Sequence, residues 1–249
     1  MKIEFDPDRM RDYEAVKKLL YVSLVPMKGN EELLRNVPHQ KLEDLAVIYR
    51  AEVSPDATVV INNHLMADYG ITQEQLHADA LQNAQEMAPA SVRPMFEVLG
   101  LPEEIVDPSV PTLYVATTQP AIHGAGVITY PNVLEEAAQK LGGDLFVLPS
   151  SIHEVLLIRD TDPQEYRNLE VMVRQINEAE VAPAERLSDR VYHYDSREHV
   201  FELAEKFAER SREKTTDRGG LDKLKEKKAE AALQPKKSSP GRGREALAL

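Results

Sequence analysis

The chain has 249 residues, of which 42% are apolar and 29% charged, with a net charge of −12 and no cysteine. This length can bury one sizeable core, and the lack of cysteine excludes disulfides, thiolate nucleophiles and thiolate metal ligands. No run approaches the roughly 20 apolar residues of a membrane span. The first 18 residues carry five acidic residues and no apolar core segment of a secretory signal, so we expect a cytoplasmic protein without membrane contact.

The charge is distributed unevenly along the chain. From Arg210 to the end there are 12 basic and 6 acidic residues, whereas the preceding 209 residues hold 18 basic and 36 acidic ones. The last segment has no apolar periodicity and cannot bury enough surface to offset its ordering entropy. We predict one α+β domain over residues 1–212 and a disordered basic tail over 213–249. This tail either only keeps the chain soluble or adds a weak contact with nucleic acid or an acidic partner.

Helices and strands alternate irregularly in the first half of the predicted domain. Asp6 and Pro7 are typical of a helix start, and an apolar stripe follows them as far as Leu20. The next expected elements are a hairpin of strands over 44–53 and 58–63, then a helix over 70–87 in which Thr72 and Gln75 form a capping box.

The second half continues this alternation. In chain order we expect strands over 112–118 and 125–130, a helix over 132–142, strands over 145–149 and 154–159, a long helix capped by Asp162, a strand over 190–195 and a closing helix from Ser196. Leu156, Leu169, Met172 and Ile176 are expected to build much of the core. So many strand-turn-strand steps predict an α+β fold with a mostly antiparallel sheet and packed amphipathic helices.

The stretch LPSSIHEVLLI, residues 148–158, places polar side chains between two β-rich runs. Ser150, Ser151, His153 and Glu154 are candidate catalytic residues, because a serine nucleophile needs a nearby base and an acid that orients this base. A Gly-x-Ser-x-Gly elbow is absent, however, and serines in turns commonly bond neighbouring backbone groups. We therefore interpret the stretch first as the polar corner of a hairpin and second as a hydrolytic site.

The sequence predicts neither a metal site nor a bound cofactor. Its seven histidines form no His-Glu-x-x-His pattern. The closest grouping is His193, Asp195 and His199, which is better explained by Asp195 capping a helix. The segment HGAGV, residues 123–127, lacks the third glycine of a dinucleotide-binding loop and leads into a β-rich run, so we interpret it as a hairpin turn.

Four blocks follow one another along the predicted domain: NEELLRNVPHQKLEDLAVIYR, GITQEQLHADALQNA, LFVLPSSIHEVLLI and VAPAERLSDRVYHYD. Together they resemble the DUF5688-type family, an uncharacterised domain-of-unknown-function family of gut anaerobes that often lies within integrative conjugative elements. The resemblance implies an accessory protein of a mobile genetic element and supplies no catalytic residue. It also implies an additional N-terminal section before the block DYEAVKK, so we expect this chain to be either a shortened or a differently started version of the family domain.

Two functions are compatible with these observations. In the favoured one, the chain is a non-enzymatic interaction protein whose acidic domain binds an unknown protein partner while the basic tail adds an electrostatic contact. In the alternative, the chain is a Ser/His-type hydrolase that uses the PSSIHE turn.

Overall fold

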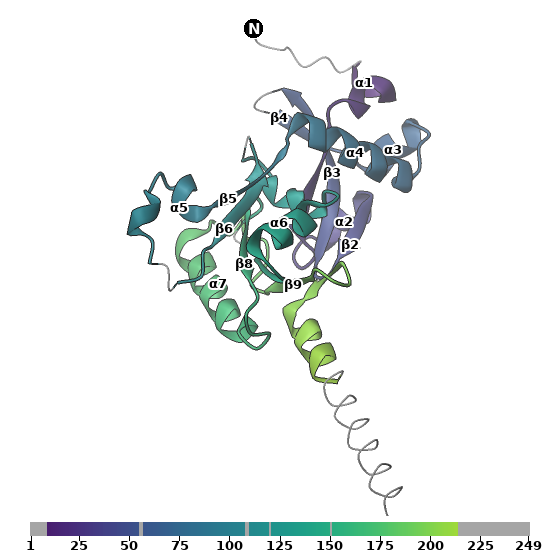
Figure 1. Ribbon diagram of the computed structural model, residues 1–249. Helices are drawn as coiled ribbons and strands as arrows, with labels where there is room; N and C mark the ends of the chain where they lie inside the picture. Colours follow the sequence, from purple (N-terminus) through teal and green to yellow (C-terminus); the bar gives the residue numbers. More distant parts are fainter. Residues whose placement is uncertain (1–8, 55–56, 108–109, 120, 150, 214–249) are drawn as a thin grey trace, which may run out of the picture. The chain divides into compact units, whose positions relative to one another are not determined.

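The structure of the chain is a computed structural model that describes residues 9–54, 57–107, 110–119, 121–149 and 151–213 (Figure 1). The chain divides into two units, Met1–Phe207 and Ala208–Leu249. The first unit holds two antiparallel sheets with packed helices, which confirms the predicted α+β class. In the second unit residues 208–213 are helical, and the predicted tail lies outside the described residues from 214 onward. Among the described helices, none is long and apolar enough to cross a membrane.

The first sheet is built around the long strand β3 (Leu45–Ser54). It pairs with β1 (Leu20–Pro26) on one edge, and with β2 (His39–Leu42) and β4 (Ala57–Val60) on the other. The β3–β4 pair confirms the predicted hairpin. The helices in this part of the chain, residues 9–87, are η1 (Arg9–Arg11), α1 (Tyr13–Lys17), α2 (Glu31–Asn36), α3 (Asn63–Asp68) and α4 (Gln73–Met87).

Helix α4 packs on β1 and confirms the predicted helix over 70–87. The Thr72 hydroxyl accepts a hydrogen bond from the Gln75 amide at 3.2 Å, as the capping box predicts. Small and apolar side chains at helical spacing, Leu76, Ala80 and Ala84, are fully buried and let the helix approach the sheet closely.

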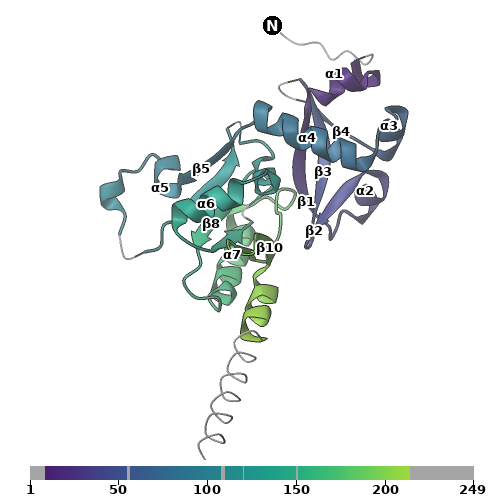
Figure 2. The same cartoon turned by 45° about the vertical axis from the view of Figure 1, so that its right-hand side comes forward.

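The second sheet has six strands in the order β10-β9-β7-β8-β6-β5, all antiparallel (Figures 1 and 2). The strands are β5 (Ala90–Pro94), β6 (Tyr114–Thr118), β7 (Leu145–Leu148), β8 (Val155–Arg159), β9 (Tyr192–Asp195) and β10 (Val200–Leu203). The helices of this half are α5 (Met95–Val98), η2 (Glu103–Ile105), η3 (Gly124–Thr129), α6 (Val133–Leu141), α7 (Tyr166–Glu180) and the helical residues 204–213. The hairpin β7–β8 and the end of α6 at Gly142 confirm the predictions for these segments.

One apolar cluster joins the two sheets, with Val22 and Tyr49 from the first and Val147 and Leu157 from the second. Helix η3 contacts β1 across this junction. A Cβ on Gly126 would lie 2.9 Å from the carbonyl oxygen of Val22, so only a glycine permits this approach.

Two partly buried hydrogen bonds also connect β9 and the loop before it to the turn before β3. The hydroxyls of Ser188 and Tyr192 donate to the carboxylate of Asp44 at 2.9 and 2.6 Å. Burial first, and then the Asp44 charge, raises the pKa of Tyr192 far above its ordinary value, so this phenol remains a donor at any physiological pH.

Three predictions of secondary structure are wrong. The strand expected over 125–130 is the 3₁₀ helix η3, because two glycines let this backbone fold tightly against its neighbours. The closing helix begins only at residue 204, because β10 first pairs with β9. The first helix is confined to Tyr13–Lys17, since Leu20 already begins β1; its expected start at Asp6 and Pro7 lies outside the described residues.

Helix α7 begins three residues later than its sequence suggests. Asp162 accepts a hydrogen bond from the Gln164 amide in the preceding turn, and the first helical residue is Tyr166. Leu156 and Leu169 are buried as expected. Met172 is half-buried, and Ile176 is 38% exposed, so its assignment to the core is wrong.

The contrast between two residues of α7 gives a stability prediction. Leu169→Ala should lower the free energy of unfolding by about 2–3 kcal/mol, because it removes a buried side chain at the edge of the core. Ile176→Ala should cost less than about 1 kcal/mol, because much of its surface already faces water. Urea unfolding of both variants tests this difference, and equal costs would contradict the packing of α7 described here.

Candidate functional site

The turn between β7 and β8 contains three of the four residues that the sequence singled out. The Ser151 hydroxyl accepts a hydrogen bond from the His153 amide at 3.0 Å, and the Ser151 amide donates to the Glu154 carbonyl at 3.2 Å. This is the pattern of a serine that closes its own turn. Ser150 lies outside the described residues.

The imidazole of His153 faces away from Ser151. Its Nδ1 accepts a hydrogen bond from the His123 amide at 3.3 Å, and its Nε2 lies 3.7 Å from Glu185 Oε1. Within the described part of the chain, no hydrogen bond joins the Ser151 hydroxyl to either ring nitrogen. A carboxylate thus lies beside the ring, but it belongs to Glu185, while the expected Glu154 contributes its carbonyl oxygen to the turn.

Residues 121–124 form a strained segment opposite this turn. Ala121 and His123 have positive φ angles of 52° and 53°, which side-chain-bearing residues rarely adopt. A Cβ on Gly124 would collide with the Thr117 hydroxyl and lie 2.5 Å from the His153 carbonyl oxygen. That oxygen already accepts a hydrogen bond from Thr117 at 2.7 Å. The two turns are thus held together by backbone contacts.

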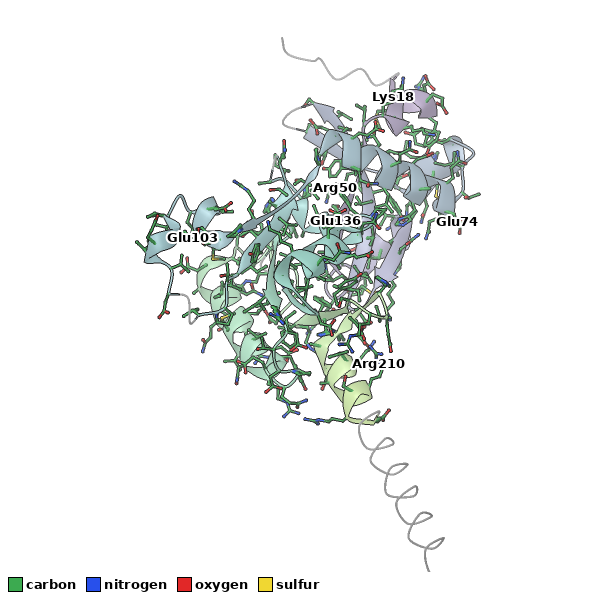
Figure 3. All side chains as sticks on the ribbon, in the orientation of Figure 1. Lys18, Arg50, Glu74, Glu103, Glu136 and Arg210 are labelled. Carbon is green, nitrogen blue, oxygen red and sulfur yellow. The ribbon has the colours of Figure 1, made fainter. Side chains whose placement is uncertain are left out.

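His123 stacks on His153, with ring centroids 5.8 Å apart, and its Nδ1 is buried without a hydrogen-bond partner among the described residues. Burial, and then the neighbouring charges of Arg50 and His153, lowers the pKa of His123 to about 4. The His123 ring is therefore neutral near pH 7. Arg50, labelled in Figure 3, is held by a hydrogen bond to the buried Ser23 hydroxyl at 2.9 Å.

The low pKa of His123 predicts how stability depends on pH. The unfolded chain binds a proton on this ring below about pH 6.5, and the folded chain only below about pH 4. This ring therefore leaves the free energy of unfolding unchanged above pH 6.5 and lowers it as the pH falls from 6.5 to 4. The pKa difference corresponds to about 3 kcal/mol, which solvent screening of a half-buried ring reduces to about 1–2 kcal/mol. His123→Asn tolerates the same backbone and should flatten the stability curve over this range. Urea unfolding from pH 4 to 7 checks this; parallel curves for the two proteins would contradict it.

The side chains that meet here differ in their access to solvent. The Nδ1 of His123 is buried, whereas the side chains of His153 and Glu185 are 34% and 48% exposed. The sequence showed His153 but gave no sign of Glu185 as its neighbour. The HGAG segment was the signal for the strained turn, although we interpreted it as part of a hairpin.

The grouping of His193, Asp195 and His199 is divided in the structure. His193 is fully buried and its Nε2 lies 3.0 Å from Asp160. Asp195 accepts hydrogen bonds from the amides of Arg197 and Glu198, so it caps the β9–β10 turn rather than a helix. His199 contacts the Tyr194 hydroxyl. In the described ranges, no three His, Asp or Glu side chains are arranged to hold a metal ion.

The most unusual surface lies between β5 and β6, in the segment Met95–Leu113. It contains five exposed large apolar side chains: Val98, Leu99, Leu101, Ile105 and Val110. Figures 1 and 2 both show α5 and the chain that follows it projecting from the ends of β5 and β6, and Figure 3 places Glu103 on this projection. The sequence reasoning missed this segment, although apolar residues without periodicity between prolines could have revealed it.

A sequence model of the family of unknown function DUF5688 matches residues 1–196, which include all four blocks quoted above. No curated protein and no solved structure gives a match.

Proposed function

Because the chain belongs to the DUF5688 family, whose function is unknown, we propose a function from its surface: it is a non-enzymatic interaction module that binds a protein partner through the segment Met95–Leu113. One observation carries this proposal. Among the described residues, five of the ten exposed large apolar side chains lie between Val98 and Val110. Contiguous exposed apolar surface on a soluble protein commonly marks an interaction site.

The charge of the segment indicates the chemistry of the partner. Residues 95–113 include four acidic residues and no Lys or Arg, and among these Glu103 and Glu104 are exposed next to Ile105. A complementary partner presents apolar side chains framed by basic ones. A second copy of the same segment would instead bring like charges together, so we propose a different protein as the partner.

A designed amphipathic helix with one Leu face and one Lys face serves as a probe for the full-length chain. Calorimetric titration should show saturable binding that weakens with added salt, since part of it is electrostatic. The variant Leu99→Ser/Ile105→Ser should bind at least about tenfold more weakly, because both apolar anchors are lost. Val171→Ser/Ile176→Ser removes two exposed apolar side chains from α7 and is the matched control. Equal weakening by both pairs would show non-specific adsorption and contradict the proposal.

The alternative, a Ser/His-type hydrolase using Ser150, Ser151, His153 and Glu154, has less support. The Ser151 hydroxyl is engaged by a backbone amide, and the His153 ring nitrogens face His123 and Glu185. A fluorophosphonate probe is therefore expected to leave the native chain unlabelled. Labelling that disappears in Ser151→Ala would establish a nucleophilic serine and overturn the non-enzymatic proposal.

Two further proposals rest on the sequence alone: an accessory role in a mobile genetic element, and contact of the basic tail with nucleic acid. If the tail makes this contact, removing residues 214–249 should abolish binding to duplex DNA and its dependence on salt. Unchanged binding would contradict the role of the tail. The cytoplasmic location stays a prediction of the same kind.

A further inference from the structure

A cavity of about 380 Å³ opens beside the projecting segment, at the ends of β6 and β8 and the last turn of α6. Its lining combines three kinds of side chain. Two are basic (Lys140 and Arg159), three carry hydroxyls (Thr112, Tyr114 and Thr161), and three are apolar (Val110, Pro111 and Leu141). The volume falls in the range of small-molecule sites.

The first cation is held in place by two contacts. The Lys140 ammonium donates a hydrogen bond to the Val92 carbonyl oxygen at 3.0 Å and lies 5.2 Å from the centre of the Tyr114 ring. These contacts use one of its three N–H donors and leave the others for a ligand. A lysine that is already oriented loses less side-chain entropy when a ligand binds.

The second cation packs over the glycine pair that ends α6. A Cβ on Gly143 would lie 3.4 Å from Arg159 Nε, and one on Gly142 would lie 3.8 Å from Nη1. The two glycines therefore leave space for the guanidinium beside the cavity. The planar guanidinium presents paired donors that match a phosphate or carboxylate group.

The charge balance of the cavity is the opposite of that of the chain. The whole chain carries −12, yet the lining contains two basic and no acidic side chains. Within the described residues, neither Lys140 nor Arg159 forms a salt bridge. The C-terminal end of α6 contributes about half a negative charge, which two full positive charges outweigh. The cavity thus attracts an anion.

From this lining we propose that the cavity binds a small molecule that joins an anionic group to an apolar or aromatic one. The anionic group, a phosphate monoester or a carboxylate, lies between Lys140 and Arg159, with the threonine hydroxyls as further donors. The apolar part lies against Leu141, Pro111 and the Tyr114 ring. This proposal goes beyond the protein-binding function, because the ligand is a small molecule and both cations lie on α6 and β8, outside the segment Met95–Leu113. The segment contributes one wall of the cavity, through Val110, Pro111 and Thr112.

Phenyl phosphate, phenylacetate and benzylammonium are suitable probes for the full-length chain, because they share a ring and differ in the charged group. Calorimetric titration should show saturable binding of at least one of the two anions and none of benzylammonium. The preferred anion then distinguishes a phosphate from a carboxylate ligand. Saturable shifts of the Thr112 and Thr161 amide signals in NMR spectra should place the ligand in the cavity.

Lys140→Gln/Arg159→Gln should weaken binding of the preferred anion by at least about tenfold. Lys18→Gln/Arg174→Gln removes the same two kinds of charge outside the cavity, from the C-cap of α1 and the surface of α7, and should change the affinity less than about twofold. Thermal unfolding confirms that both variants are folded. Saturable benzylammonium binding, no saturable anion binding, or equal weakening by the two double variants would overturn the proposal.

Discussion

Gly124→Ala is expected to lower the free energy of unfolding by about 3 kcal/mol, because the added methyl group has no space. It would meet the Thr117 hydroxyl, lie 2.5 Å from the His153 carbonyl oxygen and lie 2.7 Å from the Thr118 amide nitrogen. Two of these three atoms belong to the backbone and cannot rotate away. The substitution must therefore separate the η3 turn from the β7–β8 turn.

Gly100→Ala is the matched control for this substitution. Gly100 has a positive φ of 66°, and nothing described lies within 4 Å of the position that a Cβ would take. Its replacement should cost about 1–2 kcal/mol from backbone strain alone. Urea unfolding measures both variants, and a cost at Gly124 no greater than that at Gly100 would contradict the close contact between the two turns.

His193→Phe is expected to lower the free energy of unfolding by about 3–5 kcal/mol, because it leaves a buried carboxylate without its partner. His193 is fully buried and Asp160 is 6% exposed, and their side chains meet at 3.0 Å. The second carboxylate oxygen of Asp160 already lacks a hydrogen-bond partner among the described residues. The new ring itself should fit, because the imidazole already stacks on Phe207 and meets the Phe146 ring edge-on.

The double variant Asp160→Leu/His193→Phe separates loss of the polar contact from loss of packing. Replacing both members of a buried polar pair by apolar residues is commonly neutral or stabilising, so the double variant should recover most of the lost stability. A double variant as unstable as the sum of the two single ones would mean that the pair acts through the shape of its side chains rather than through their polar contact.

Elements with strong local signals could be predicted from the sequence. The capping box at Thr72, the Gly142 stop and the hairpins β3–β4 and β7–β8 all depend on residues close together in the chain. The errors lie where distant contacts decide the structure. The segment after His123 has β-forming residues, but its glycines fit against Val22 and Thr117 only in the folded chain, so it becomes a 3₁₀ helix.

The same distinction between local signals and distant contacts applies to the candidate sites. The sequence correctly placed Ser151 and His153 in a turn, but the neighbours of the His153 ring come from residues 30 positions before and 32 after it. The cavity likewise joins Thr112 of a loop to Lys140 of α6 and Arg159 of β8, and no local pattern links them. Charges scattered along a chain reveal a site only after folding brings them together.

Hydrogen–deuterium exchange of the full-length chain, with and without the amphipathic basic helix, tests the proposed interaction surface most directly. We predict slower exchange within Met95–Leu113 on binding, and unchanged exchange in α7, which also has exposed apolar side chains. Slower exchange spread over the whole described chain, or unchanged exchange within Met95–Leu113, would contradict the claim that a partner docks on this segment.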